Sequence, residues 1–375
     1  PVPTRTGTLT LGENSLTEVA PDDLAQTAVD AQAQAVSRIE LAGKEITLQA
    51  GARVVAPGGN VNVVATQIPR LEENPGLTKD IPPNDSKVVM QSGSLIDVSG
   101  LASALLPMER NIIAVELRGN ELRDAPLQRN GPLRGETVYV DVREGTPLAD
   151  VSGQIATIQR PLDERLSAGG KVTIVSEGAV VMQENAVIDV SGGAVRYQDG
   201  FLNTTQLVSQ GRVYDIGDAD PNRPYDGIFG VYKAEHRKWG VTQTFNLFGA
   251  QGNSRFEAGY VEGKDAGTVG INAHTLDLQG SLRGETTAGR HQRLLPASLP
   301  ADAAYTRRYD QVPLGGELIL GAEGYSGLQD FTLRPLAELG AVGMNRLRVY
   351  ANGRITAPED ADLVFAPGGE LTLAA

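Results

Sequence analysis

A short pattern that recurs five times limits the folds open to this chain. A small residue and one or two glycines precede alternating apolar positions: PGGNVNVVA at 57–65, AGGKVTIVS at 168–176, DAGTVGINA at 265–273, LGGELILGA at 314–322 and PGGELTLAA at 367–375. An apolar period of two predicts a strand that buries one face. The chain is therefore expected to be built from short strands that follow glycine turns.

A second pattern reads SLIDVSG at 94–100, PLADVSG at 147–153 and AVIDVSG at 186–192. In each copy the apolar residues on both sides of the aspartate should point inward, and the aspartate should point outward before a Ser-Gly turn. Residues 168–193 join both patterns and predict three short strands in succession. Strands this short bury one repeating face if the chain coils and each turn stacks on the last. The expected fold class is all-β, a parallel β-helix (β-solenoid).

Four segments interrupt the repeats. Residues 18–38 read as one short helix, because Pro21 suits a first helical position and Asp22 and Asp23 suit the N-terminal turn. Residues 67–86 and 102–135 read as loops.

The fourth interruption, residues 194–263, holds Trp239 and most of the aromatic residues, which predicts a small subdomain with its own core. The predicted layout is β-helix rungs over 1–193 with the three smaller insertions, the aromatic-rich insertion 194–263, and rungs again over 264–375. Within the first part, residues 136–193 are expected to be among the strongest rungs.

Composition excludes several classes of function. The net charge is −13 and no basic cluster dominates, so nucleic acid is not an expected partner. The absence of cysteine excludes disulfides and thiolate metal sites. No apolar run approaches the roughly 20 residues of a membrane helix, so membrane insertion is not expected.

The IDVSGG turns, the glycine-started strands, and the runs at 211–227 (GRVYDIGDADPNRPYDG) and 260–293 resemble the filamentous-haemagglutinin family. These are large exoproteins of two-partner secretion systems in Gram-negative bacteria, and the similar region lies toward their C-terminal part. The resemblance implies a right-handed β-helix, an outer-membrane transporter as export partner, a secreted or cell-surface location, and roles in adhesion or biofilm. The Asn-Pro-rich signatures of the family's secretion domain are reduced here to Asn74-Pro75-Gly76. The resemblance therefore implies a part of the exoprotein other than the one that engages the transporter.

The outward aspartates are the first candidate site. Asp97, Asp150 and Asp189 occupy equivalent repeat positions, and direct stacking about 4.8 Å apart would favour a bridging cation such as calcium, or an acid cluster. The alternative is an Asx-turn, in which each aspartate binds backbone two residues on. Asp-x-Ser-Gly favours the turn, and the distance between the copies in sequence argues against direct stacking.

A second candidate is calcium at Asp218, Asp220 and Asn222, whose alternate spacing matches the start of an EF-hand loop. Arg223 and Phe229 stand where that loop needs Gly and Glu, so a polar turn is the competing interpretation. No other cofactor is indicated.

A third candidate is the basic-aromatic patch of AEHRKWG, with His236, Arg237 and Trp239. Such a patch could stack on a sugar or hold an anionic glycan, and Tyr225 of the same insertion joins it as a ligand-binding candidate. The competing interpretation, which the usual burial of tryptophan favours, is that Trp239 packs locally.

No nucleophile elbow, phosphate-binding loop or dinucleotide fingerprint occurs. The expected function is a structural and adhesive segment without catalysis, whose receptor is a host molecule or an exopolysaccharide. The alternative is a β-helical enzyme that binds or degrades polysaccharide, using Asp189 with Arg196, or Asp218 and Asp220 with Arg223. A biofilm-matrix binder that carries a glycan-binding flap is the third possibility.

Overall fold

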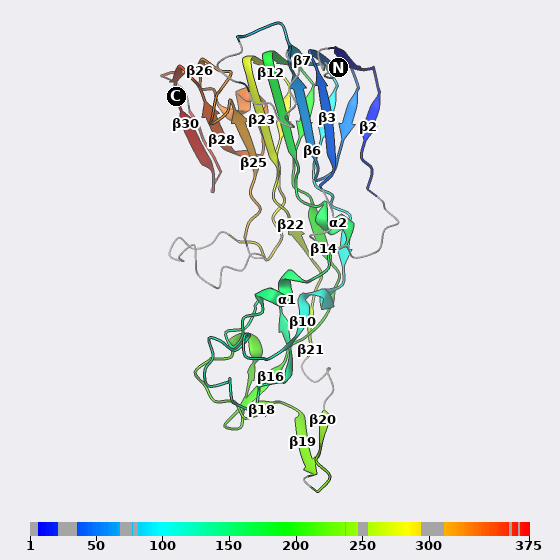
Figure 1. Ribbon diagram of the computed structural model, residues 1–375, viewed down its shortest axis with the longest axis vertical. Coiled ribbons are helices and arrows are strands. Elements are labelled where there is room, and N and C mark those ends of the chain that lie inside the picture. The colour runs from blue at the N-terminus through cyan, green and yellow to red at the C-terminus, as the bar shows by residue number, and fades with distance from the viewer. Residues whose placement is uncertain are drawn as a thin grey trace, which may run out of the picture.

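The computed structural model describes residues 7–21, 36–67, 77, 82–236, 238–246, 254–293, 311–359, 362–366 and 368–375. Strands take up 44% of the described residues and helices 6%, so this part of the chain is all-β. Figure 1 shows two parts: a body of side-by-side strands and a lobe that extends away from it. Both labelled chain ends lie at the body.

The body contains two sheets in which every strand pair is parallel. The larger sheet has ten strands: β1 (Thr8–Leu11), β3 (Arg38–Gly43), β4 (Glu45–Leu48), β6 (Asn60–Ala65), β7 (Lys87–Met90), β12 (Lys171–Met182), β23 (Thr268–Leu278), β25 (Gly316–Leu320), β28 (Met344–Tyr350) and β30 (Glu370–Ala374). The smaller has six: β2 (Leu16–Glu18), β5 (Arg53–Val55), β8 (Leu95–Asp97), β13 (Val187–Asp189), β24 (Ser281–Arg283) and β27 (Ala341–Val342). A further parallel pair joins β26 (Asp330–Thr332) to β29 (Arg354–Thr356), and the 3-10 helix η4 (Leu336–Leu339) precedes β27. The five glycine-started copies form β6, β12, β23, β25 and β30, as predicted.

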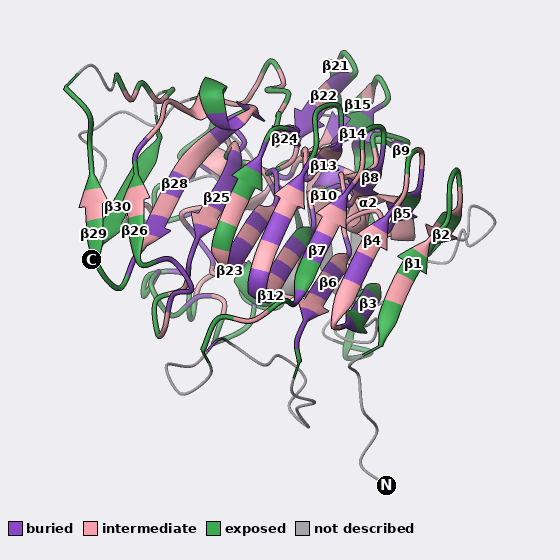
Figure 2. Cartoon of the chain, turned by 90° about the horizontal axis from the view of Figure 1, so that it is seen from above, coloured by how far each residue is buried: buried purple, intermediate pink, exposed green. Residues whose placement is uncertain are grey.

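The chain alternates between the two sheets. It passes from β4 to β5, from β7 to β8, from β12 to β13 and from β23 to β24, and each passage lies beside the previous one in register. Aliphatic side chains consequently form rows across the strands, such as the row of Val54, Ile96, Ile188, Leu282 and Ala341 in the smaller sheet. These rows fill one core that both sheets share, and Figure 2 shows the alternation of buried and more exposed residues along strands such as β12.

The glycines before the strands are explained by close backbone contact between successive passages. A Cβ added to Gly170 would lie 2.0 Å from the carbonyl oxygen of Gly59, and one on Gly267 would lie 1.7 Å from that of Gly170. No side chain fits at these distances, so the corner that precedes the larger sheet requires glycine.

Two insertions at this same corner build the lobe, one between β8 and β12 and the other between β13 and β23. They leave the body together as a three-stranded sheet of β9 (Ala104–Leu106), β14 (Ala194–Tyr197) and β22 (Tyr260–Gly263). The remaining elements of the first are η1 (Met108–Asn111), β10 (Ile112–Glu116), β11 (Thr137–Asp141), α1 (Ser152–Ala156) and α2 (Leu162–Arg165). Those of the second are β15 (Gly200–Asn203), β16 (Gln206–Ser209), β17 (Arg212–Asp215), η2 (Ile216–Asp218), β18 (Gly227–Ile228), β19 (Val231–His236), β20 (Val241–Asn246) and β21 (Ser254–Glu257).

The lobe corrects part of the predicted layout. Residues 136–166 were expected among the rungs, but β11 pairs antiparallel with β10 and its Val138 and Val140 enter the lobe core beside Leu207 and Tyr225. The aromatic-rich insertion therefore shares its core with the preceding insertion. Residues 102–135, predicted as a loop, supply β9, η1 and β10 to the same lobe.

The copy PLADVSG at 147–153 is also corrected. It forms a turn followed by α1, so Asp150 does not lie in a sheet. Its carboxylate forms an ion pair with Arg123 at 2.8 Å. The Asp150 carboxylate accepts from the backbone N–H of Ser152 at 3.0 Å, so the Asx-turn of this motif survives without the strand.

Most of the predicted helix over 18–38 and of the predicted loop over 67–86 falls outside the described residues. The flanking positions Glu18 and Arg38 belong to β2 and β3. In the part of the chain that the structure describes, no helix is long and apolar enough to span a membrane.

Candidate functional site

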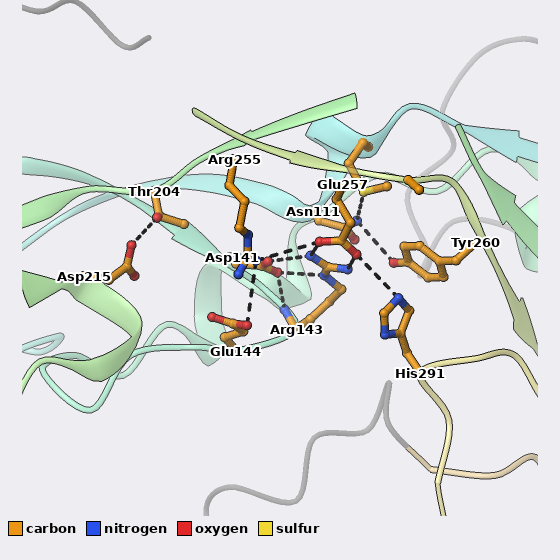
Figure 3. Close-up of polar contacts among 12 residues, drawn as sticks. Asn111, Asp141, Arg143, Glu144, Thr204, Asp215, Arg255, Glu257, Tyr260 and His291 are labelled. Atoms are coloured by element: carbon orange, nitrogen blue, oxygen red, sulfur yellow. Dashed lines mark hydrogen bonds and ion pairs between the residues drawn. The ribbon is translucent and has the colours of Figure 1, made fainter. Parts of the chain in front are cut away.

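A buried polar network lies in the lobe near its junction with the body, and Figure 3 shows its side chains. Arg143 follows β11, Asn111 ends η1, Glu257 ends β21 and Tyr260 begins β22. The network therefore joins the two insertions at residues separated by more than one hundred positions.

Arg143 stands at its centre and binds two carboxylates in a bidentate manner. Its Nη2 and Nε donate to Asp141 at 2.7 and 3.0 Å, and its Nη1 and Nη2 donate to Glu257 at 2.7 and 2.9 Å. Burial of Arg143 opposes its charge, but the hydrogen bonds to Glu257 and Asp141 outweigh burial and raise its pKa. The hydrogen bond from Arg143 lowers the pKa of Glu257. Arg143 and Glu257 are thus held in their charged forms at neutral pH.

Aromatic rings close one side of the network. Tyr260 stacks on Tyr197 with ring centroids 4.6 Å apart, and the Arg143 guanidinium lies 5.5 Å from its centroid. Its hydroxyl accepts from Asn111 Nδ2 at 3.3 Å, and burial raises the pKa of Tyr260 to about 12.

His291 reaches the network from the chain segment after β24. Its ring meets Tyr260 edge-on at 4.8 Å. Arg290 Nε donates to His291 Nε2 at 2.9 Å, so this nitrogen acts as an acceptor, and its separation of 3.6 Å from Glu257 Oε1 is too long for a hydrogen bond.

The chemistry of this network suits a structural role. The carboxylates of Asp141 and Glu257 are both engaged by one guanidinium, and Tyr260 stays protonated well above neutral pH. The pKa of Glu257 is lowered and that of Tyr260 is raised, so both shifts move away from the pH range near 7 in which a general acid or base works best. The arrangement fixes the two insertions against each other.

The second candidate place is the hairpin of β19 and β20, which lies at the end of the lobe away from the body (Figure 1). Trp239 lies in the turn between β19 and β20 and is 71% exposed, so the expectation that Trp239 packs locally is wrong. The His236 ring lies 5.9 Å from the Trp239 ring, and its Nε2 lies 3.1 Å from Gln243 Oε1, to which it donates when Nε2 carries the proton. Lys238 Nζ lies 5.9 Å from the same Trp239 ring. Arg237 lies outside the described residues.

Tyr225, predicted beside this patch, lies elsewhere. It is 3% exposed in the lobe core and meets Tyr214 edge-on at 6.2 Å. Burial raises the pKa of Tyr225. A ring at this depth serves packing, and the structure does not bring it to the surface with Trp239.

The predicted calcium residues form a polar turn. Asp218 lies in η2, and Asp220 accepts from the backbone N–H of Asn222 at 2.9 Å, which is an Asx-turn. Within the described ranges, no group of three or more histidines and acids is placed to hold a metal, so no further such ligand joins Asp218 and Asp220. Arg223, which the enzyme alternative placed with Asp218 and Asp220, packs over the Tyr214 ring at 4.3 Å.

For the candidate aspartate site, the expectation about stacking is wrong and the Asx-turn is confirmed. Asp97 and Asp189 are direct neighbours in register, contrary to the expectation from their distance in sequence, and Arg283 is the next neighbour of Asp189. Each aspartate accepts from the backbone N–H of the serine two residues on, at 2.9 Å, as the Asx-turn interpretation predicted. Asp189 thus lies beside Arg283 in its sheet, whereas Arg196 is on β14.

Sequence reasoning missed the Arg143 network. A local signal existed in the run VYVDVREG at 138–145, where two acids flank an arginine after alternating valines. Nothing in that run indicates Glu257 or Tyr260 as partners.

Comparison with protein-family models finds no match, and comparisons with curated proteins and with solved structures find none either. Function is therefore inferred from the fold and the side chains alone.

Proposed function

We propose that this chain is a segment of a right-handed parallel β-helix from a large secreted exoprotein of the filamentous-haemagglutinin kind, and that it serves as scaffold and adhesive element rather than as an enzyme. The observation that carries the proposal is a stacked parallel body that bears one lobe with an aromatic hairpin open to solvent.

The alternation between two parallel sheets supports the β-helix. Parallel strands need crossover connections, and a chain that crosses repeatedly between the same two sheets in register advances by one strand spacing, about 4.8 Å, per passage. Crossovers between parallel strands are right-handed in nearly all proteins. Such a body converts chain length into reach, which suits a surface fibre.

The position of the insertions supports the adhesive role. Both lobe insertions leave at one corner, so the core rows continue beneath them: Ile96 and Ile188 remain neighbours although the first insertion separates their strands. A scaffold of this kind can present a loop-built lobe without disturbing its own core. The export partner proposed with it is an outer-membrane two-partner-secretion transporter, and the location is the cell surface or the medium of a Gram-negative bacterium.

An adhesion assay under flow tests the proposal. Beads coated with the purified chain should be retained on epithelial monolayers or on bacterial biofilm more than beads coated with the heat-unfolded chain. Equal retention of the two kinds of bead, on the monolayers and on the biofilm, would contradict the adhesive role. In parallel, the purified chain is incubated with acidic and neutral polysaccharides, and the length of the polysaccharides should stay unchanged. Release of shorter saccharides would instead favour a polysaccharide-degrading enzyme.

A further inference from the structure

The tip of the β19–β20 hairpin combines exposed apolar side chains with a cation. Trp239, Val241 and Phe245 are 71%, 49% and 46% exposed, and Lys238 lies beside the Trp239 ring. Val241, Gln243 and Phe245 alternate along β20 and therefore face the same side of the ribbon. His236 faces that side too, because it is the register partner of Val241.

This hairpin projects from the lobe. It is a two-stranded ribbon at the end of the lobe away from the body (Figure 1), and Trp239 stands in the turn between its strands. Small ligands bind in concave sites that bury most of their surface. A protruding tryptophan instead suits a partner that is broad and deformable, because only such a partner can close around a tip.

The charge of the hairpin favours an anionic partner. The chain carries a net charge of −13, whereas the hairpin sequence 231–246 has three basic residues against one acidic residue. An anionic surface would repel the body and accept the tip, and the screening length of about 8 Å at physiological salt lets the two regions act separately.

We propose that the hairpin tip docks peripherally on an anionic lipid bilayer, with Trp239 at the level of the headgroups and Lys238 against their phosphates. Tryptophan favours this position because its ring is apolar and its N–H is polar. A lysine near an anionic bilayer contributes attraction without insertion. The inference names a partner for the proposed adhesive role and rests on that role for its biological meaning.

Trp239 is the only tryptophan of the chain, so its fluorescence reports on the tip alone. Adding vesicles of phosphatidylcholine with phosphatidylglycerol should shift the emission of the full chain to shorter wavelength, and nitroxide-labelled lipid should quench it. Vesicles of phosphatidylcholine alone should produce a much smaller shift, and added salt should reverse the shift seen with the anionic vesicles.

Co-sedimentation with the anionic vesicles tests the residues. Trp239→Ala should weaken binding by about tenfold or more, from lost burial of the ring, and Lys238→Ala should weaken it by about fivefold. Phe201→Ala is the matched control, since Phe201 is also exposed, at 52%, but lies on β15 outside the hairpin, and it should leave binding unchanged.

Three results would overturn the inference: no binding to anionic vesicles, equal binding to both vesicle types, or an emission shift with a soluble acidic polysaccharide and none with vesicles. An emission shift that depends only on protein concentration would assign the tip to a second copy of the chain instead. Retention of coated beads on cells together with any of these results would leave the adhesive role standing and remove only the lipid partner.

Discussion

The body and the lobe are stabilised in different ways. In the body, the same contact recurs from passage to passage, as in the row of Val172, Val269, Leu318 and Leu347. In the lobe each contact occurs once, and the two bidentate ion pairs of Arg143 join segments that no repeat relates. A repetitive part can lose one contact and keep its neighbours, whereas in the lobe one buried charge joins the two insertions in addition to their shared apolar core.

This difference sets how much the sequence can predict. The strands of the body follow from a pattern of glycine and alternating apolar residues, because the glycines mark close backbone contact and the alternation marks the buried face. Within the body, Asp97 and Asp189 were expected as turn residues and are so. Their direct stacking was not expected, because an insertion separates them in sequence but not in space.

The lobe resisted prediction for a physical reason. Antiparallel pairing of β10 with β11 and the partners of Arg143 are set by tertiary contacts between two insertions, and no local pattern encodes them. The copy PLADVSG was wrongly predicted to form a strand, because Asp-x-Ser makes the same Asx-turn after a strand of the body and in the turn before α1. Trp239 misled because tryptophan is usually buried, and exposure at a hairpin tip is decided by what the lobe leaves uncovered.

The largest expected effect is in the lobe. Arg143→Ala leaves the carboxylates of Asp141 and Glu257 buried without their cation, which costs about 3–5 kcal/mol of lobe stability. Hydrogen exchange should accelerate in β10, β11 and β21 and stay unchanged in β12. Arg118→Ala is the matched control, because the Arg118–Glu116 pair is solvent-exposed, and it should change exchange little. Equal effects of the two variants would mean that the buried network does not hold the lobe.

In the body, one core side chain should matter nearly as much. Ile188 is fully buried in the row of the smaller sheet, and Ile188→Ala should lower the free energy of unfolding by about 2–5 kcal/mol through lost burial and a cavity. Urea unfolding followed by far-UV circular dichroism measures the loss. Thr173→Ala, on the half-buried outward side of β12, is the control and should cost far less. If hydrogen-exchange protection in the lobe falls together with that in the body, the two parts unfold as one unit and are not stabilised separately.

The lobe should also be the part that responds to pH at both extremes. The hydrogen bond from Arg143 lowers the pKa of Glu257 below its ordinary value of 4.5, so the stability from this group is present above about pH 4.5 and is lost as the pH falls through the folded pKa. Burial raises the pKa of Tyr260 from 10 to about 12, so its stability is present below pH 10 and is lost as the pH rises toward 12. Hydrogen exchange, compared with intrinsic exchange at each pH, should show β21 and β22 losing protection before β12 in acid and in alkali. Tyr260→Phe should remove the alkaline loss specific to the lobe, and a lobe that opens in alkali to the same extent with phenylalanine would contradict this cause.

The smallest effect tests the stacked aspartates of the body. Asp97 has Asp189 on one side and Val55 on the other in its sheet, so its charge meets a like charge and no cation in register. Asp97→Asn keeps an oxygen to accept from the Ser99 N–H and removes the repulsion, and it should therefore stabilise the protein by about 0.2–1 kcal/mol. Asp97→Ala loses the Asx-turn as well and should destabilise by about 0.5–1.5 kcal/mol.

Urea unfolding with and without millimolar calcium separates the two interpretations of this stack. If calcium bridges Asp97 and Asp189, it will stabilise the parent chain and make Asp97→Asn the less stable of the two, whereas turn chemistry alone predicts the same ranking with and without the ion.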